Sequence, residues 1–141
     1  MIKSTEQLKN EIKSADNIQD YINNNKENMI NYGLTSYLQQ LLEQKDMTKA
    51  CVVKNSLLDR NYIYQIFNGT RHPSRDTLIA LCFSMQLNLE ETQNALKISI
   101  HRELYPRDNR DSIIIFAIDN MYDIIKANIL LSENGFSPIC K

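Results

Sequence analysis

Apolar residues recur three or four positions apart through the middle of the chain, between residues 34 and 99. This is the spacing of a helix with one buried face, and polar segments divide it into five helices. The first is expected from about Ser36 to Gln44, with Thr35 as its N-cap. The others begin at residues that can cap or open a helix, namely Thr48, Asp59, the pair Pro73-Ser74, and Asn88 with Glu91, which resembles a capping box. Gly69 ends the third helix.

The flanking segments also carry helical patterns. The first thirty residues contain one or two short amphipathic helices, broken near Ser14 to Asn17, and we expect this arm to pack on the core. After Pro106, a sixth helix is expected from about Arg110 to Asn120 and a seventh from about Asp123 to Asn134. The β-branched run from Ile113 to Ile115 could equally form a strand. The pattern predicts an all-α protein with a helical arm over 1–33, a domain over 34–99 and a helical extension over 100–141.

One stretch carries more information than a helical pattern, because a helix that stops at Gly69 runs into a basic loop before another helix. Residues 61–75 read NYIYQIFNGTRHPSR. Extended back to Met47 (MTKACVVKNSLLDRNYIYQIFNGTRHPS), the stretch resembles the helix-turn-helix core of the phage-repressor, Cro-like (XRE-type) family of DNA-binding regulators. The resemblance covers residues 34–96 and implies a five-helix repressor-type helix-turn-helix domain. It also implies a sequence-specific transcriptional regulator that binds double-stranded DNA, with the third helix, about Arg60 to Phe67, in the major groove.

Leu57 departs from the family pattern, which usually has a glycine in the turn between the paired helices. Leucine in the left-handed conformation costs roughly 1 to 2 kcal/mol, so we expect this turn to be built differently. Val53, Phe67 and Cys51 also depart, since the family usually has a small alanine, a glutamate and an acidic capping partner there. These changes affect the crossing angle of the two helices more than the fold.

Residue by residue, the resemblance implies two sets of contacts with DNA and no cofactor or metal. Arginine suits guanine, and asparagine or glutamine suits adenine, because each can form two hydrogen bonds with one base edge. The side chains at base-contacting positions are Lys49, Arg60, Asn61, Tyr64 and Gln65. Those at phosphate-contacting positions, around the loop and the helix N-termini, are Thr48, Asn68, Thr70, Arg71, His72, Ser74 and Arg75.

Charge is distributed unevenly, although the whole chain has a net charge of only -1. Residues 44–75 contain six basic and two acidic residues, whereas both flanking segments are net acidic. Positive charge concentrated on the segment with the motif is expected of a phosphate-binding face, and an ordinary solvated helical face could also carry it.

Other functional classes find little support in the sequence. His72 and His101 lack a paired carboxylate, nucleophile or metal-ligand spacing, so we expect no enzymatic activity. Asp108 and Asp111 are expected to form a charged turn that caps the sixth helix. The three cysteines lack Cys-x-x-Cys spacing, no apolar run is long enough to span a bilayer, and the first ten residues lack the apolar core of a signal peptide. We therefore expect a cytoplasmic protein with reduced thiols.

Two questions stay open at the level of sequence. The C-terminal helices could form a homodimer interface, since such regulators commonly bind two half-sites, or they could complete a monomeric core. The chain could also keep the fold as a protein-protein interaction module, an adaptor or antitoxin, that holds a partner with Tyr62, Tyr64, Phe67 and the apolar tail. Exposed base-contacting side chains beside the basic loop would favour DNA, whereas an N-terminal arm that covers Tyr64 would favour the protein partner.

Overall fold

The computed structural model describes residues 3–140, and Met1, Ile2 and Lys141, the ends of the predicted arm and extension, lie outside them. The described residues form nine α-helices and one short 3-10 helix, with no strand. The all-α prediction is therefore confirmed, and the alternative of a strand at Ile113 to Ile115 is wrong, because these residues lie inside a helix. The elements are α1 (Thr5–Ser14), α2 (Ile18–Asn24), η1 (Lys26–Asn28), α3 (Ile30–Gln44), α4 (Lys49–Asn55), α5 (Arg60–Phe67), α6 (Arg75–Ser84), α7 (Leu89–Ile98), α8 (Asn109–Asp119) and α9 (Ile124–Glu133).

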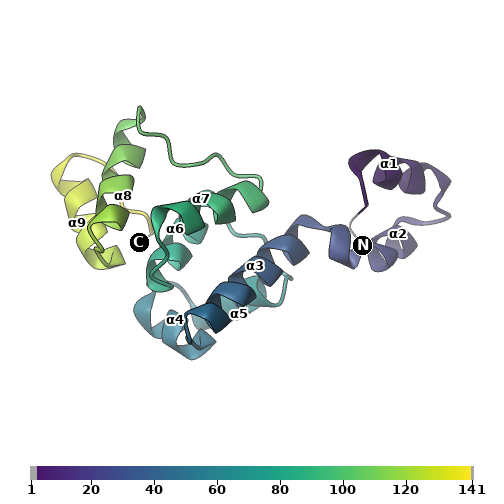
Figure 1. Cartoon of the computed structure of the whole chain (residues 1–141), viewed down its shortest axis with the longest axis horizontal. Coiled ribbons are helices and arrows are strands. Elements are labelled where there is room, and N and C mark those ends of the chain that lie inside the picture. The colour runs from purple at the N-terminus through teal and green to yellow at the C-terminus, as the bar shows by residue number, and fades with distance from the viewer. Residues whose placement is uncertain (1–2, 141) are drawn as a thin grey trace.

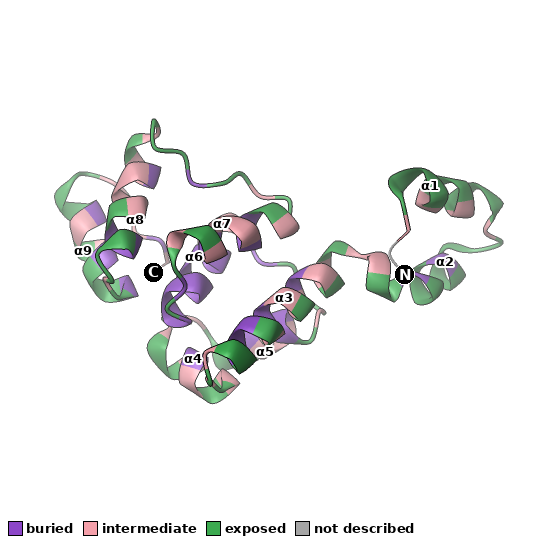
Figure 2. Ribbon diagram, in the orientation of Figure 1, coloured by how far each residue is buried: buried purple, intermediate pink, exposed green. Residues whose placement is uncertain are grey.

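Helix α6 forms the centre of the core. Every residue from Thr77 to Ser84 is buried, and α6 packs against α4, α7 and α9 (Figures 1 and 2). A helix that is apolar on all sides is stable only when other helices surround it. The neighbouring helices each contribute one buried face, as α3 does with Leu34, Leu38, Leu41 and Leu42.

Most predicted helix starts are confirmed. The side chains of Thr48, Asp59, Ser74 and Asn88 each accept a hydrogen bond from the third backbone amide of the helix that follows, and Glu91 completes the capping box of α7. The predicted cap Thr35 is wrong. It lies inside α3, which begins earlier at Ile30, and its hydroxyl donates to the Ile66 carbonyl oxygen at 3.2 Å. A threonine can satisfy a distant carbonyl as well as a free amide, and the local pattern does not distinguish the two uses.

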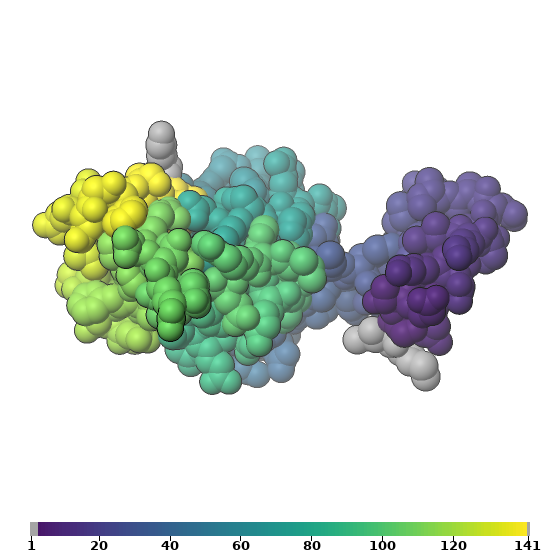
Figure 3. Space-filling view, turned by 90° about the horizontal axis from the view of Figure 1, so that it is seen from above, coloured from purple at the N-terminus to yellow at the C-terminus, as the bar shows by residue number. Residues whose placement is uncertain are grey.

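The N-terminal arm does not pack on the core as predicted. Helices α1 and α2 pack against each other, with the break at residues 15–17, and lie at the N-terminal end of α3 as a separate lobe (Figures 1 and 3). Within the described part of this lobe, residues 3–28, α1 buries no residue, and Tyr21 and Asn25 are the only two that are buried. The lobe is too polar to cover a core surface, and Ile12 and Ile18 remain at least half exposed.

Helices α8 and α9 pack against each other and extend the same core. Ile114 and Ala117 of α8, Leu131 of α9 and Ile139 after it belong to one buried cluster with the side chains of α6. Gly135, with a φ of 82°, ends α9 where the sequence predicted. The C-terminal extension is thus part of the main body, next to the helices that carry the candidate site.

Candidate nucleic-acid interface

Helix α5 exposes the polar face that the sequence predicted. Ile63, Ile66 and Phe67 are buried, each at 2% exposure or less, and attach the helix to α3 and α4. Arg60 and Asn61 are exposed at its start, and the helix is only eight residues long. Between them and the exposed C-cap Asn68, three half-buried side chains complete the face, namely Tyr62, Tyr64 and Gln65. The helices of the N-terminal lobe do not cover this face (Figure 1).

The connection from α4 to α5 is built without a left-handed residue. Ser56 adopts an extended conformation at the end of α4, with a φ of -103°, and its hydroxyl accepts a hydrogen bond from the Leu58 amide at 3.2 Å. Leu57 has no positive φ, so it does not carry the strain that a glycine would relieve. Its side chain is 43% exposed, while Leu58 packs against the core. The expectation that this turn is built differently is confirmed.

Three positively charged side chains lie over aromatic rings of α5. The Lys49 ammonium is 5.6 Å from the centroid of the Phe67 ring and joins the first turn of α4 to the last turn of α5. The Arg60 guanidinium lies 5.3 Å from the Tyr64 ring centroid, and that of Arg71 lies 5.0 Å from the ring centroid of Tyr62. Cation–π contacts of this kind position a charge without neutralising it.

The loop after α5 folds back and contacts α5 itself. Gly69 takes a φ of 83°, and the Thr70 hydroxyl donates to Asn68 Oδ1 at 2.7 Å. Arg71 Nε then donates to Gln65 Oε1 at 3.1 Å. This bond joins a base-contacting and a phosphate-contacting position of the sequence analysis into one unit, and the Gln65 amide group remains a donor.

His72 is tied to α3 rather than free. Its Nδ1 lies 2.9 Å from Asn31 Oδ1, and Asn31 Nδ2 donates to the Gly69 carbonyl oxygen at 3.3 Å. The ring of His101 lies 5.2 Å away, and its Nε2 is 2.8 Å from the Pro73 carbonyl oxygen. Burial, and then the charge of His101, hold the pKa of His72 below its ordinary value. A neutral His72 supports the loop and adds no fixed positive charge to it.

Arg75 is engaged by the C-terminal extension. Its guanidinium donates to both carboxylate oxygens of Asp111, at 3.1 and 2.8 Å, and to the carbonyl oxygens of Arg102 and Glu103. Asp111 is 1% exposed and also accepts from the backbone amide of Tyr105 at 3.0 Å. The sequence predicted that Arg75 contacts phosphate, but its guanidinium is already bound by Asp111 and two backbone carbonyl oxygens. Beside it Ser74 is an exposed residue whose side chain caps α6.

Sequence reasoning missed the role of Asp111. It was grouped with Asp108 as a helix-capping turn, and Asp108 does cap α8, but Asp111 faces the body one turn later. Arg110 on the same helix pairs with Asp76 at 2.9 Å, so both arginine-carboxylate pairs join α6 to α8. The available signal was an aspartate three positions after a cap aspartate and separated by one serine from an apolar run, where a solvent-facing charge is not expected.

In the described part of the chain, three arginines near the C-terminal extension have carboxylate partners, whereas the basic residues of α4, α5 and the following loop that were predicted to contact DNA do not. Within residues 3–140, a carboxylate lies within 4.0 Å of Arg75, Arg102 and Arg110 on the side of the C-terminal extension. No such pair involves Lys49, Arg60 or Arg71 in the same range. Around the motif, positive charge without a carboxylate partner therefore lies on α4, α5 and the loop that follows α5, where an anion could approach it. Exposed residues elsewhere within 3–140, such as Lys97, Arg107 and Lys126, also lack such a partner.

Among residues 3–140 no cluster of three histidine, cysteine or acidic side chains could hold a metal ion. None of the helices that the structure describes is both long and apolar enough to cross a membrane. Compared with known proteins, the chain matches no family model, no curated protein and no solved structure.

Proposed function

We propose that the protein is a sequence-specific DNA-binding transcriptional regulator in which α3 to α7 act as a repressor-type helix-turn-helix domain. The observation that carries the proposal is the face of α5, where Arg60, Asn61 and Gln65 lie beside the uncompensated charge of Arg71. An α-helix with its side chains is about 10 to 12 Å in diameter, which fits a major groove about 12 Å wide. At about 1.5 Å per residue, the eight residues of α5 extend about 12 Å.

The polar groups of this face have the chemistry of base recognition. Arg60 is suited to guanine, and Asn61 or Gln65 to adenine, through paired hydrogen bonds to one base edge. Tyr64, under the Arg60 guanidinium, holds that side chain toward the groove. Lys49, at the start of α4, would contact a base edge or the adjacent backbone. Thr48 before it, and Asn68, Thr70 and Arg71 after α5, would bind the flanking phosphates. Arg75 has a different role, because its ion pair with Asp111 of α8 fixes the start of α6, where the loop after α5 ends.

Affinity from one copy is expected to be modest. About three free cations per copy predict that the logarithm of the binding constant falls with the logarithm of the salt concentration with a slope of roughly -3. Binding of two copies to two half-sites would double this slope. Exposed apolar side chains on α8, on α9 and in the turn between them supply a candidate surface for such a homodimer, namely Phe116, Met121, Ile125 and Ile129, each more than half exposed.

The same exposed apolar side chains favour one second candidate, a protein-protein interaction module such as an adaptor or antitoxin. In this alternative Tyr62 and Tyr64 would contact the partner, since both are half-buried and accessible. Phe67 would not take part, because it is 2% exposed beneath Lys49. The two candidates differ in whether the cations of α5 are needed.

Binding of the purified protein to DNA from its own upstream region, against a scrambled competitor and across a salt series, distinguishes them. The variant carries Arg60→Ala with Gln65→Ala, and the matched control carries Arg107→Ala with Gln19→Ala, two exposed residues outside the candidate surface. Specific, salt-dependent binding that only the first variant loses supports the regulator. Absence of specific binding, or equal binding by both variants, would lead to the protein-partner alternative.

A further inference from the structure

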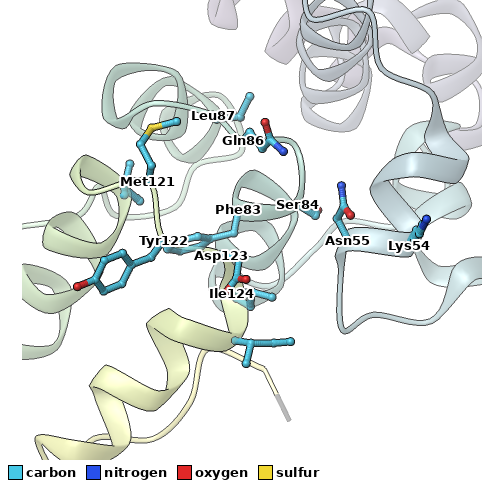
Figure 4. A pocket seen from close by; sticks show the side chains of 12 residues that line it. Lys54, Asn55, Phe83, Ser84, Gln86, Leu87, Met121, Tyr122, Asp123 and Ile124 are labelled. Atoms are coloured by element: carbon cyan, nitrogen blue, oxygen red, sulfur yellow. The ribbon is translucent and has the colours of Figure 1, made fainter.

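A cavity of about 460 Å³ lies on the main body, and none of the residues that line it belongs to α5 (Figure 4). Three segments that are distant in the sequence form it: the end of α4, the end of α6 with the residues after it, and the turn between α8 and α9. Its volume falls within the range of about 300 to 1,000 Å³ of small-molecule sites, which occur preferentially where separate structural units meet.

The floor of the cavity is apolar. Phe83, Leu87, Ile118 and Ile124 reach it with only 3% to 8% of their surface still exposed. A ligand with an apolar body would remove this remaining surface from water, which is favourable in proportion to the area covered. Polar side chains stand at the edge, with Lys54 on the α4 side and Asp123 on the opposite side (Figure 4).

The lining contains two charged side chains, Asp123 and Lys54, which differ in their hydrogen-bond and ion-pair partners. Asp123 caps α9, because its carboxylate accepts a hydrogen bond from the Lys126 amide at 2.8 Å and lies at the positive end of the helix. Within residues 3–140, no carboxylate lies within 4.0 Å of the Lys54 ammonium, and the side chain is exposed. Asp123 also has no salt-bridge partner in this range, but its charge is offset by the N-terminus of α9, so the less compensated charge of the lining is that of Lys54.

We propose that this cavity binds a small amphipathic monoanion, an aliphatic or aromatic carboxylate. Its apolar body contacts Phe83, Leu87 and Ile124, and its carboxylate accepts hydrogen bonds from Lys54 and from the side-chain amide of Asn55. Lys54 and Asn55 belong to neither the base-contacting nor the phosphate-contacting set, whereas Met121 and Ile125 of the lining also belong to the candidate dimer surface.

Met121 provides a test that does not endanger the fold. It lies at the edge of the cavity, is 81% exposed and adopts a φ of 60°, a conformation that glycine takes at lower cost. Its flexible thioether can cover ligands of different shape. Ile100 is a matched control, because it is 72% exposed with the same φ of 60° and does not line the cavity. Met121→Gly and Ile100→Gly thus relieve the same backbone strain, and only the first removes a side chain from the cavity.

The experiment is a titration of the full chain with octanoate, followed by backbone-amide and methyl NMR, with octylammonium and octanol as probes of equal chain length. We expect saturable shifts at Phe83, Leu87, Met121 and Ile124 with octanoate and weaker ones with octanol. Lys54→Met should weaken octanoate about fivefold, as expected for an exposed ion pair, and leave octanol unchanged. Met121→Gly should weaken both, and Ile100→Gly neither.

Four results would overturn the proposal. They are shifts that do not saturate, shifts confined to residues outside the cavity, binding of octylammonium as tight as that of octanoate, and an unchanged octanoate affinity in Lys54→Met. Shifts at Phe116 and Ile129 in place of the cavity residues are an example of the second result. They would mean that octanoate binds non-specifically to the exposed apolar face of α8 and α9.

Discussion

The ion pair between Arg75 and Asp111 should be the strongest single link between the C-terminal extension and the rest of the protein. Asn in place of Asp111 keeps the shape and removes the charge. The carboxylate is 1% exposed and the Arg75 side chain 19% exposed, so the replacement leaves a guanidinium largely out of water without its counter-ion. Removing one partner of a buried pair costs about 3 to 5 kcal/mol. The lower end applies here, because Arg75 keeps its bonds to two carbonyl oxygens at 2.8 and 3.0 Å.

A loss of about 3 kcal/mol is a large fraction of the 5 to 15 kcal/mol that typically stabilises a folded protein. Urea denaturation followed by circular dichroism measures the free energy of unfolding of Asp111→Asn against that of the natural chain. Asp76→Asn is the matched control, since its pair with Arg110 is more exposed and should contribute about 1 kcal/mol or less. The double variant Arg75→Met, Asp111→Asn should lose less than the two single losses together, because neither charge is left alone. Equal losses in Asp111→Asn and Asp76→Asn, or strict additivity, would refute the reasoning.

The pH dependence provides a second check on the same pair. Burial by itself would raise the pKa of Asp111, but the hydrogen bonds from Arg75 and from the Tyr105 amide, with the charges of Arg75 and Arg102, outweigh it and lower the pKa below its ordinary value of 3.8. An acid whose pKa is lowered by folding stabilises the protein above its ordinary pKa, and this stabilisation is lost as the pH falls through the lowered value. The difference between the natural chain and Asp111→Asn should therefore shrink in strong acid.

Three further predictions concern other parts of the structure. Because burial lowers the pKa of His72, folding favours its neutral form, and the free energy of unfolding should fall as the pH drops below the ordinary value of 6.5, less so in His72→Gln, as denaturation at a series of pH values would show. Cys82 is fully buried, which raises the pKa of its thiol to about 12, so iodoacetamide should modify Cys51 and spare Cys82 in the native protein, as read by peptide mass spectrometry. Gly69→Ala should cost roughly 1 kcal/mol in urea denaturation, because alanine is strained at a φ of 83° while the added carbon meets its nearest neighbour at an ordinary 3.5 Å. An unchanged pH dependence in His72→Gln, early alkylation of Cys82, or a Gly69→Ala variant as stable as the natural chain would contradict the respective prediction.

The helices of the main body were predictable because their signals are local. Capping side chains such as Asp59 and Asn88 bind amides three residues away, and the period of the apolar positions separates Ile63 from Asn61 without knowledge of the fold. In contrast, the sequence of a helix does not show which other helix it packs against. The pattern of the first thirty residues indicated helices correctly and did not show that they bury too little apolar surface to lie on the core.

For the candidate site too, the local features were predictable and the long-range contacts were not. The outward and inward sides of α5 follow from helical periodicity, but the partners that position the side chains do not. The Arg75 and Asp111 side chains meet across 36 residues, and His72 meets Asn31 across 41. Contacts at such separations arise only after the helices have packed, so the sequence could not distinguish Arg71, which keeps its charge available, from Arg75, which does not.

Recognition of bases by the side chains of α5 can be measured by selection from a random double-stranded DNA library. The natural chain, Arg60→Ala and the control Arg107→Ala, which removes the same charge at an exposed residue outside the candidate surface, would be selected in parallel. We expect the natural chain and the control to enrich one common sequence, and Arg60→Ala to lose about tenfold of the preference for guanine at a single position of each half-site. Failure of the natural chain to enrich any sequence, or an unchanged preference in Arg60→Ala, would show that Arg60 on α5 does not recognise a base.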